Sequence, residues 1–288
     1  MLSFPSLPDN PYYMSAFLSR LLFGLMGIKK PHVFDYKFSG ISVWIEPEIV
    51  NTTTSSEDYD GNKNKEESSK KDPTTMISKM MKDFAHQCGG PERGLHPFPA
   101  HCTLLYNMQP HRVIEYASLA SNTCGEEATR ESLSIEAASQ ILLEDCRMKY
   151  KESMGSHSSS GKLELYPTSL ECFPCPPFAC AISFLMFALD TKLERLFEVV
   201  SETFPPDARH SGSGTRRHQL QPHMSLVYAP MSETQWLMEE TQRLNKNSSV
   251  RETLLDSRTR NPLPVTYLSV WSTEGSLDEW RCLARVKI

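Results

Sequence analysis

Short apolar stretches bounded by proline, glycine or polar residues predict the strands of this chain. Residues 39–45 (SGISVWI) carry β-branched and aromatic side chains in near alternation, and Pro47 stops the run. Two further apolar stretches, 101–106 (HCTLLY) and 223–228 (HMSLVY), each begin at a histidine and predict buried strands. We expect the remaining strands at 162–170, 179–189, 265–272 and 281–288.

Apolar residues spaced three and four positions apart predict helices between these strands. In 74–88 they form one face, and a Gly-Gly-Pro sequence then stops the pattern. A loop rich in serine and glycine is expected at 154–162. We expect helices at 74–88, 191–204 and 236–246, and helical structure over 110–151 with a break near Cys124 and Gly125.

The order strand, helix, histidine strand occurs twice along the chain. The first copy ends in the strand that begins at His101 and the second in the strand that begins at His223, 122 residues later. This order predicts two related halves, each built from strands and a helix.

Two segments lie outside this repeat. Residues 51–73 have almost no apolar side chains and predict a disordered insertion, because they cannot bury enough surface to offset the loss of chain entropy. Residues 1–38 form an N-terminal extension whose apolar part, within 12–28, is short for a membrane span and has no basic leader. We expect an amphipathic helix packed on the protein, with a membrane tether or organelle-targeting presequence as the alternative. Residues 39–288 then form one domain.

Composition and charge narrow the class of protein. The 288 residues are 39% hydrophobic and 23% charged, which is typical of a soluble globular protein. A net charge of −5 argues against a protein that coats long nucleic acids, since that binding depends on many lysine and arginine contacts. A small anionic ligand is still compatible, because a few local donors can hold one phosphate. We expect a cytoplasmic monomer.

The eight cysteines follow no disulfide framework, so we expect reduced thiols. The one CxxC sequence, from Cys172 to Cys175, has no second pair at the spacing of a zinc site. The two prolines after it favour a turn.

Each histidine strand places an imidazole and a hydroxyl on one face. Because side chains alternate along a strand, His101 and Thr103 project to one side and Cys102 to the other. His223 and Ser225 repeat the arrangement. A single match is a weak signal, since a lone strand histidine is usually structural, but two matches in equivalent places predict a shared site.

Two facing histidines suit the hydrolysis of a phosphodiester. If a pseudo-twofold axis relates the halves, one imidazole accepts a proton from water while the opposite one donates a proton to the leaving oxygen. Histidine serves both purposes near neutral pH, because its unperturbed pKa is about 6.5. Thr103 and Ser225 would hold the phosphate oxygens. Neither motif has nearby acidic residues at metal-binding spacing, so we expect no metal and no cofactor.

Four segments resemble the two-histidine phosphoesterase superfamily, and within it the cyclic phosphodiesterases of plant and yeast type. They are SVWIEPE at 42–48, HCTLLY at 101–106, PHMSLVYAPMSE at 222–233 and LSVWSTEGSLDEWRCLARVKI at 268–288. The resemblance covers 39–288. It implies a bilobal α+β fold in which two pseudo-symmetric strand-helix-strand lobes, with antiparallel sheets, flank a central cleft.

The resemblance also implies an activity, the opening of ADP-ribose 1″,2″-cyclic phosphate and nucleoside 2′,3′-cyclic phosphates to monophosphates. His101 and His223 fall on the family's catalytic positions, with Thr103 and Ser225 as phosphate-binding residues. By analogy, the second histidine activates the water.

Two further residues match positions that contact ligand in that family. Trp44 would stack on the base, although a tryptophan in an apolar strand fits the core equally well. Tyr228 would donate to the phosphate, but alternation puts it on the face opposite Ser225 unless the strand ends or bulges. The loop before the second motif offers a clamp for a second phosphate, or else an ordinary solvated loop, in Arg209, Arg216 and Arg217.

Two other functions fit the same residues. A related two-histidine enzyme acting on RNA ends should have a basic groove, which the net charge disfavours. A non-catalytic nucleotide-binding module would bind a cyclic phosphate without turning it over, and it has no need of both imidazoles and both hydroxyls.

Overall fold

The protein is described here by a computed structural model that covers nine segments of the chain. The predictions for the extension 1–38, for most of the insertion 51–73, and for Arg216 and Arg217 lie outside these segments. The described residues are 39–48, 72–89, 98–122, 133–155, 162–175, 180–205, 209–210, 221–256 and 261–288.

Nine strands form one open sheet, in the order β3-β8-β1-β2-β7-β5-β4, with β6 paired to β2 and β9 to β8. All pairings among these described strands are antiparallel. The two histidine strands, β2 and β7, are neighbours in the middle. The strands are β1 (Ile41–Pro47), β2 (Cys102–Met108), β3 (Glu164–Leu165), β4 (Pro167–Cys175), β5 (Cys180–Phe187), β6 (Arg209–His210), β7 (His223–Pro230), β8 (Leu263–Ser272) and β9 (Arg281–Lys287).

Six helices accompany the sheet in the described part of the chain. Side-chain caps fix where several begin, since the Asp72 carboxylate accepts from the amides of Thr74 and Thr75, and Asp190 accepts from the amide of Leu193. The helices are α3 (Pro73–Gln87), α4 (Pro110–Asn122), α5 (Ile135–Met154), α6 (Thr191–Thr203), α7 (Thr234–Lys246) and α8 (Ser248–Val250). The fold is therefore α+β, as predicted.

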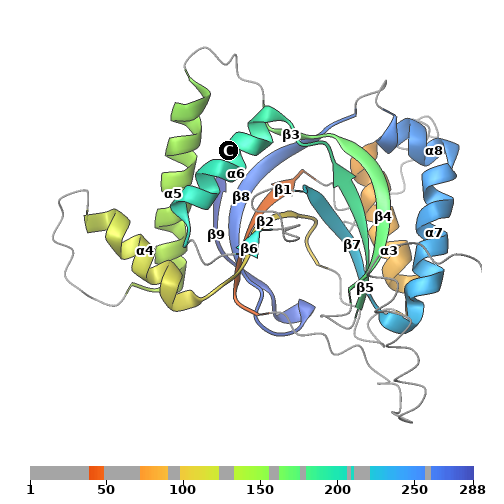
Figure 1. Cartoon of the computed structure of the whole chain (residues 1–288), viewed down its shortest axis with the longest axis horizontal. Helices are drawn as coiled ribbons and strands as arrows, with labels where there is room; N and C mark the ends of the chain where they lie inside the picture. The colour runs from red at the N-terminus through yellow and green to blue at the C-terminus, as the bar shows by residue number, and fades with distance from the viewer. Residues whose placement is uncertain are drawn as a thin grey trace, which may run out of the picture.

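The sheet is strongly curved, and the helices cover its outer, convex side (Figure 1). Helices α4, α5 and α6 lie outside the limb that contains β8 and β9, and α3, α7 and α8 lie outside the limb that contains β4 and β5. Helix α3 comes from the first half of the chain but packs on β7, whereas α6 comes from the second half and packs on β2. The halves thus exchange helices across the middle of the sheet.

The main apolar core lies between the sheet and these helices. It includes Cys102 and Met224, the residues in the middle of the two motifs, and both are fully buried. The concave face, on the opposite side, carries a smaller cluster made of Cys180, Ile182, Tyr228 and Leu277 with the partly buried Phe98, Cys175, Phe184 and Trp280. The concave face is where alternation sends the two histidines.

The predicted helices at 74–88, 191–204 and 236–246 are confirmed to within two residues at each end. Helix α3 begins at Pro73, so the last two residues assigned to the polar insertion belong to its start. The predicted helical stretch 110–151 contains α4 and α5, and the residues between 123 and 132 lie outside the description. Among the described helices, none is long and apolar enough to cross a bilayer.

One sequence prediction in the second half was wrong. The single strand expected at 162–170 is two strands, β3 and β4, and β4 continues to Cys175. The CxxC sequence lies at the end of β4, and the turn predicted at the two prolines after it lies outside the described residues. Pro174 is tolerated within the strand because β4 is an edge strand, so its missing N–H breaks no ladder.

Candidate active site

The two histidine strands lie side by side with their motifs in register. Cys102 of β2 pairs with Met224 of β7, and both side chains point into the core. The residues on either side of this pair lie on the concave face. Antiparallel pairing then sets the imidazole of each motif beside the hydroxyl residue of the other, His101 with Ser225 and His223 with Thr103.

His101 is enclosed, with 2% of its surface exposed. Its Nδ1 lies 2.6 Å from the carbonyl oxygen of Pro99, and its ring stacks face to face on Trp44 at a centroid distance of 3.5 Å. The pKa of His101 is lowered to about 4, chiefly by burial; the hydrogen bond to Pro99 opposes this effect, and the nearby His223 adds a smaller lowering. His101 is therefore neutral at pH 7.

His223 has the same backbone contact in a more open setting. Its Nδ1 lies 2.8 Å from the carbonyl oxygen of Gln221, and the ring is only half-buried. Phe184 meets it edge to face, with ring centroids 4.6 Å apart. Burial lowers the pKa of His223, and the bond to Gln221 opposes that effect.

The two backbone bonds fix the same tautomer in both rings. A carbonyl oxygen can only accept, so Nδ1 of each neutral imidazole carries the proton and donates it. The Nε2 atom of each ring is left with its lone pair. Each histidine is thus prepared to take a proton at Nε2 and to return it.

An aromatic residue flanks each motif from the outer neighbouring strand. Trp44 of β1 pairs with Thr103, and Phe184 of β5 pairs with Ser225. The two aromatic residues therefore occupy equivalent places around the Cys102 pair, one against each histidine. Sequence analysis identified Trp44 but missed Phe184, because a phenylalanine in a continuous apolar run gives no local signal.

Trp44 is 1% exposed, stacked on His101 and also, at 4.7 Å, on Trp271. This geometry gives it the role of a packing partner for the histidine, the core position that the sequence also allowed. Stacking of a base on Trp44 remains a prediction, and one that needs the ring to be uncovered.

A buried carboxylate anchors the far end of this stack. Glu46 accepts from Ser269 Oγ at 2.5 Å and from Trp271 Nε1 at 3.0 Å, and it pairs with Arg285 at 2.6 Å. These donors satisfy a charge that would otherwise be costly to bury. Sequence analysis missed Glu46, although its place two residues after Trp44 puts it on the same face.

Tyr228 lies on the same face as Ser225, because of a bulge. Strand β5 pairs Phe184 with Ser225 but Ser183 with Val227, so Leu226 is the extra residue. The Ser225 hydroxyl donates to the Tyr228 hydroxyl oxygen at 3.0 Å, and burial raises the pKa of Tyr228. The bulge that the sequence analysis required for Tyr228 to lie on the same face as Ser225 is therefore present.

The predicted arginine clamp is not tested by the described residues. Arg209 begins β6 and pairs through its backbone with Tyr106 of β2, and the other two arginines lie outside the description. In the described part of the chain, no group of three histidine, cysteine or acidic residues could hold a metal ion.

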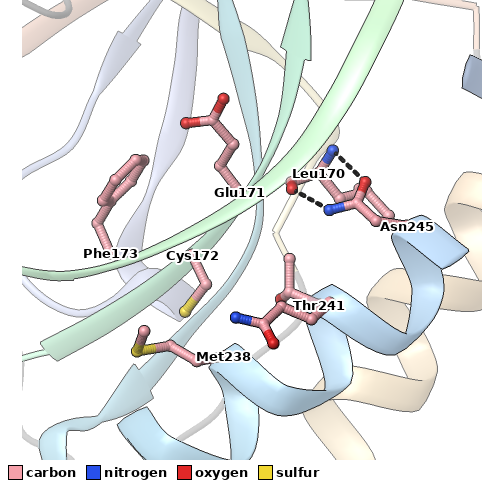
Figure 2. A pocket seen from close by; sticks show the side chains of 8 residues that line it. Leu170, Glu171, Cys172, Phe173, Met238, Thr241 and Asn245 are labelled. Carbon is pink, nitrogen blue, oxygen red and sulfur yellow. Dashed lines mark hydrogen bonds between the residues drawn. The ribbon is translucent and has the colours of Figure 1, made fainter.

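A pocket of about 230 Å³ lies on the other side of the sheet, between β4 and α7 (Figure 2). Leu170 and Cys172 face α7 there, whereas Glu171 and Phe173 point away from it. The Asn245 amide accepts from the Leu170 N–H at 3.0 Å and donates to its carbonyl at 2.6 Å, as a neighbouring strand would. This contact covers part of the sheet edge, so we assign the region a structural role.

Searches of protein-family models and of curated proteins found no match to this chain.

Proposed function

We propose that the protein is a metal-independent cyclic phosphodiesterase that opens small cyclic phosphates by paired histidine acid-base chemistry. The observation that supports it is the register of β2 and β7, which sets two imidazole-hydroxyl motifs beside each other on one face. A single structural histidine would need neither the second ring nor the matching tautomers.

In the proposed reaction, the Nε2 atoms of His101 and His223 carry out the two proton transfers. One imidazole takes a proton from water as the water oxygen bonds to phosphorus, and the other donates its proton as the P–O bond to the ribose oxygen breaks. Thr103 and Ser225 lie where hydroxyls can hold the non-bridging oxygens, with Tyr228 beside Ser225. The products are a monophosphate and two histidines in exchanged protonation states.

The histidine that acts as donor must first carry a second proton, and its buried surroundings disfavour that charged form. Burial lowers the pKa of both histidines, so the negative charge of the bound substrate must favour their charged forms. Binding of a phosphate and protonation of one ring are therefore coupled in this scheme.

The proposal includes a fold of two pseudo-symmetric lobes. The equivalent places of Trp44 and Phe184, and the exchange of α3 and α6 between the halves, support two pseudo-symmetric lobes of the two-histidine phosphoesterase kind. A local twofold axis that exchanges the two motifs would pass midway between Cys102 and Met224, perpendicular to the sheet.

The test is hydrolysis of nucleoside 2′,3′-cyclic phosphates and ADP-ribose 1″,2″-cyclic phosphate in EDTA. We expect wild-type turnover to survive chelation, and His101→Ala and His223→Ala each to lose roughly 10²–10⁴-fold in kcat. His111→Ala, which changes an exposed histidine on α4, is the matched control and should not alter kcat.

Folded wild-type protein that turns over neither compound would contradict the proposal. Hydrolysis of oligonucleotide ends instead would favour the RNA-end enzyme, and binding without turnover would favour the nucleotide-binding module.

A further inference from the structure

Two phenylalanines form a partly exposed surface beside His223. Phe184 is half-buried and meets His223 edge to face, and Phe173 of β4 lies 6.2 Å from it with its ring tilted by 42°. Phe173 is 47% exposed, one of the largest exposures of an apolar side chain among the described residues. Exposed phenylalanines next to a site are informative, because most such side chains are buried.

Both rings face the site rather than the helices. Phe184 pairs with Ser225, and Phe173 pairs with Ile182, which in turn pairs with Tyr228. Directly paired residues share a face of the sheet, so both phenylalanines lie on the concave face with the two motifs. Figure 2 shows the Phe173 side chain pointing away from α7.

The spacing between neighbouring strands sets how far the two phenylalanine rings lie from the proposed phosphate site. Strand β5 is the immediate neighbour of β7, and β4 is the next one out. Neighbouring strands are about 4.8 Å apart, so Phe184 lies one spacing from Ser225, whereas Phe173 lies two spacings from Tyr228. In a nucleoside 2′,3′-cyclic phosphate, one furanose ring separates the base from the cyclic phosphate, which suits this short reach.

The charges on this limb disfavour a longer anionic substrate. Strands β4, β5 and β7 contain no lysine or arginine, and their one acidic residue is Glu171, which pairs with Phe184. A pyrophosphate laid across this surface would meet a carboxylate and no cation from these strands. An uncharged base meets no such penalty.

We propose that Phe184 and Phe173 form the surface on which the base of a nucleoside 2′,3′-cyclic phosphate stacks. The inference rests on the proposed function and names its substrate class. Stacking on an aromatic ring tolerates any base, so the surface distinguishes nucleoside substrates from cyclic phosphates without a nearby base. It also takes over the role that the sequence assigned to the buried Trp44.

The first experiment compares substrates with and without a base. In Phe184→Ala we expect KM for nucleoside 2′,3′-cyclic phosphates to rise roughly 5- to 100-fold, the range of one base-aromatic stack. KM for glycerol 1,2-cyclic phosphate, which has no base, should stay unchanged. Phe173→Ala should show a smaller rise with the same selectivity, and Phe184→Trp should restore the wild-type value.

Leu119→Ala is the control, since Leu119 is an exposed apolar residue on α4, away from this limb. It should leave both KM values unchanged. An equal rise for both substrates in Phe184→Ala would overturn the inference, as would no rise for either. If Phe184→Ala does not fold, Phe173→Ala decides the question, because its exposed ring contributes little to the core.

A binding measurement separates failure of this inference from failure of the proposed function. Nucleoside 2′-monophosphate should shift the ring-proton NMR signals of Phe184 and Phe173, and inorganic phosphate should not. Those shifts without any turnover would leave the stacking surface in place and refute the hydrolase. Turnover of nucleoside substrates without those shifts would keep the hydrolase and refute the stacking surface.

Discussion

His101 and His223 hold matching positions in the two motifs, but the ring of His101 is enclosed and the ring of His223 is partly exposed. His101 is 2% exposed and stacked on Trp44, whereas His223 is half-buried with Phe184 at its edge. The local pattern, an imidazole and a hydroxyl two residues apart with Nδ1 bound to the carbonyl two residues back, is the same in both.

The difference comes from the neighbouring strands. On one side β1 and β8 bring Trp44, Trp271 and the Glu46 carboxylate into a closed stack. On the other side β5 and β4 bring two phenylalanines that stay partly exposed. The two matching motifs therefore lie in different surroundings, one closed and the other partly exposed.

The largest difference between the two sides should appear when the aromatic partner of each histidine is removed. We expect Trp44→Ala to lower the free energy of unfolding by about 3–5 kcal/mol, because it leaves a cavity under His101. Phe184→Ala should cost only about 1–2 kcal/mol, since part of its ring already contacts water. Urea denaturation of the two variants measures the difference. Equal losses would mean that the two sides are packed alike.

The second largest effect should come from acidification, because protonation of the enclosed His101 ring destabilises the folded protein. The pKa of His101 is about 4 in the folded protein and near 6.5 when unfolded, so between these values the unfolded chain binds more protons. The contribution of neutral His101 to the free energy of unfolding is therefore fully present above pH 6.5. The free energy of unfolding then falls by about 3 kcal/mol as the pH drops to 4.

Unfolding titrations of the wild type and of His101→Gln between pH 7 and pH 4 measure this loss. The variant should lack most of it, and His223→Gln should lack a smaller part, since the shift at the half-buried ring is in the same direction. An unchanged pH dependence in His101→Gln would show that His101 is not buried in its neutral form.

The smallest effect concerns the bulge in β7. Tyr228→Phe removes the hydroxyl that accepts from Ser225, and we expect a loss of about 1 kcal/mol. Tyr106→Phe, at a half-buried tyrosine of β2, is the control and should cost less. Thermal denaturation compares them, and equal values would argue against the Ser225 contact as a stabilising bond.

Local periodicity was enough to predict most elements of the fold. Strands β1, β2, β5, β7, β8 and β9 and the main helices follow from alternation and from three-four spacing, because each depends on residues close together in the chain. The shared face of His101 and Thr103, and of His223 and Ser225, follows in the same way. The error at β4 arose because proline normally ends a strand. Pro167 and Pro174 are accepted in β4 because it is an edge strand.

The sequence by itself therefore determined the two motifs, the faces on which they lie and the α+β class, since these depend on neighbours in the chain. Only the tertiary structure decided that β2 pairs with β7 in register, that Leu226 bulges to turn Tyr228 toward Ser225, and that Trp44 is covered while Phe184 stays open. Strand pairing joins residues more than a hundred positions apart, and no local pattern records which strand will be the neighbour.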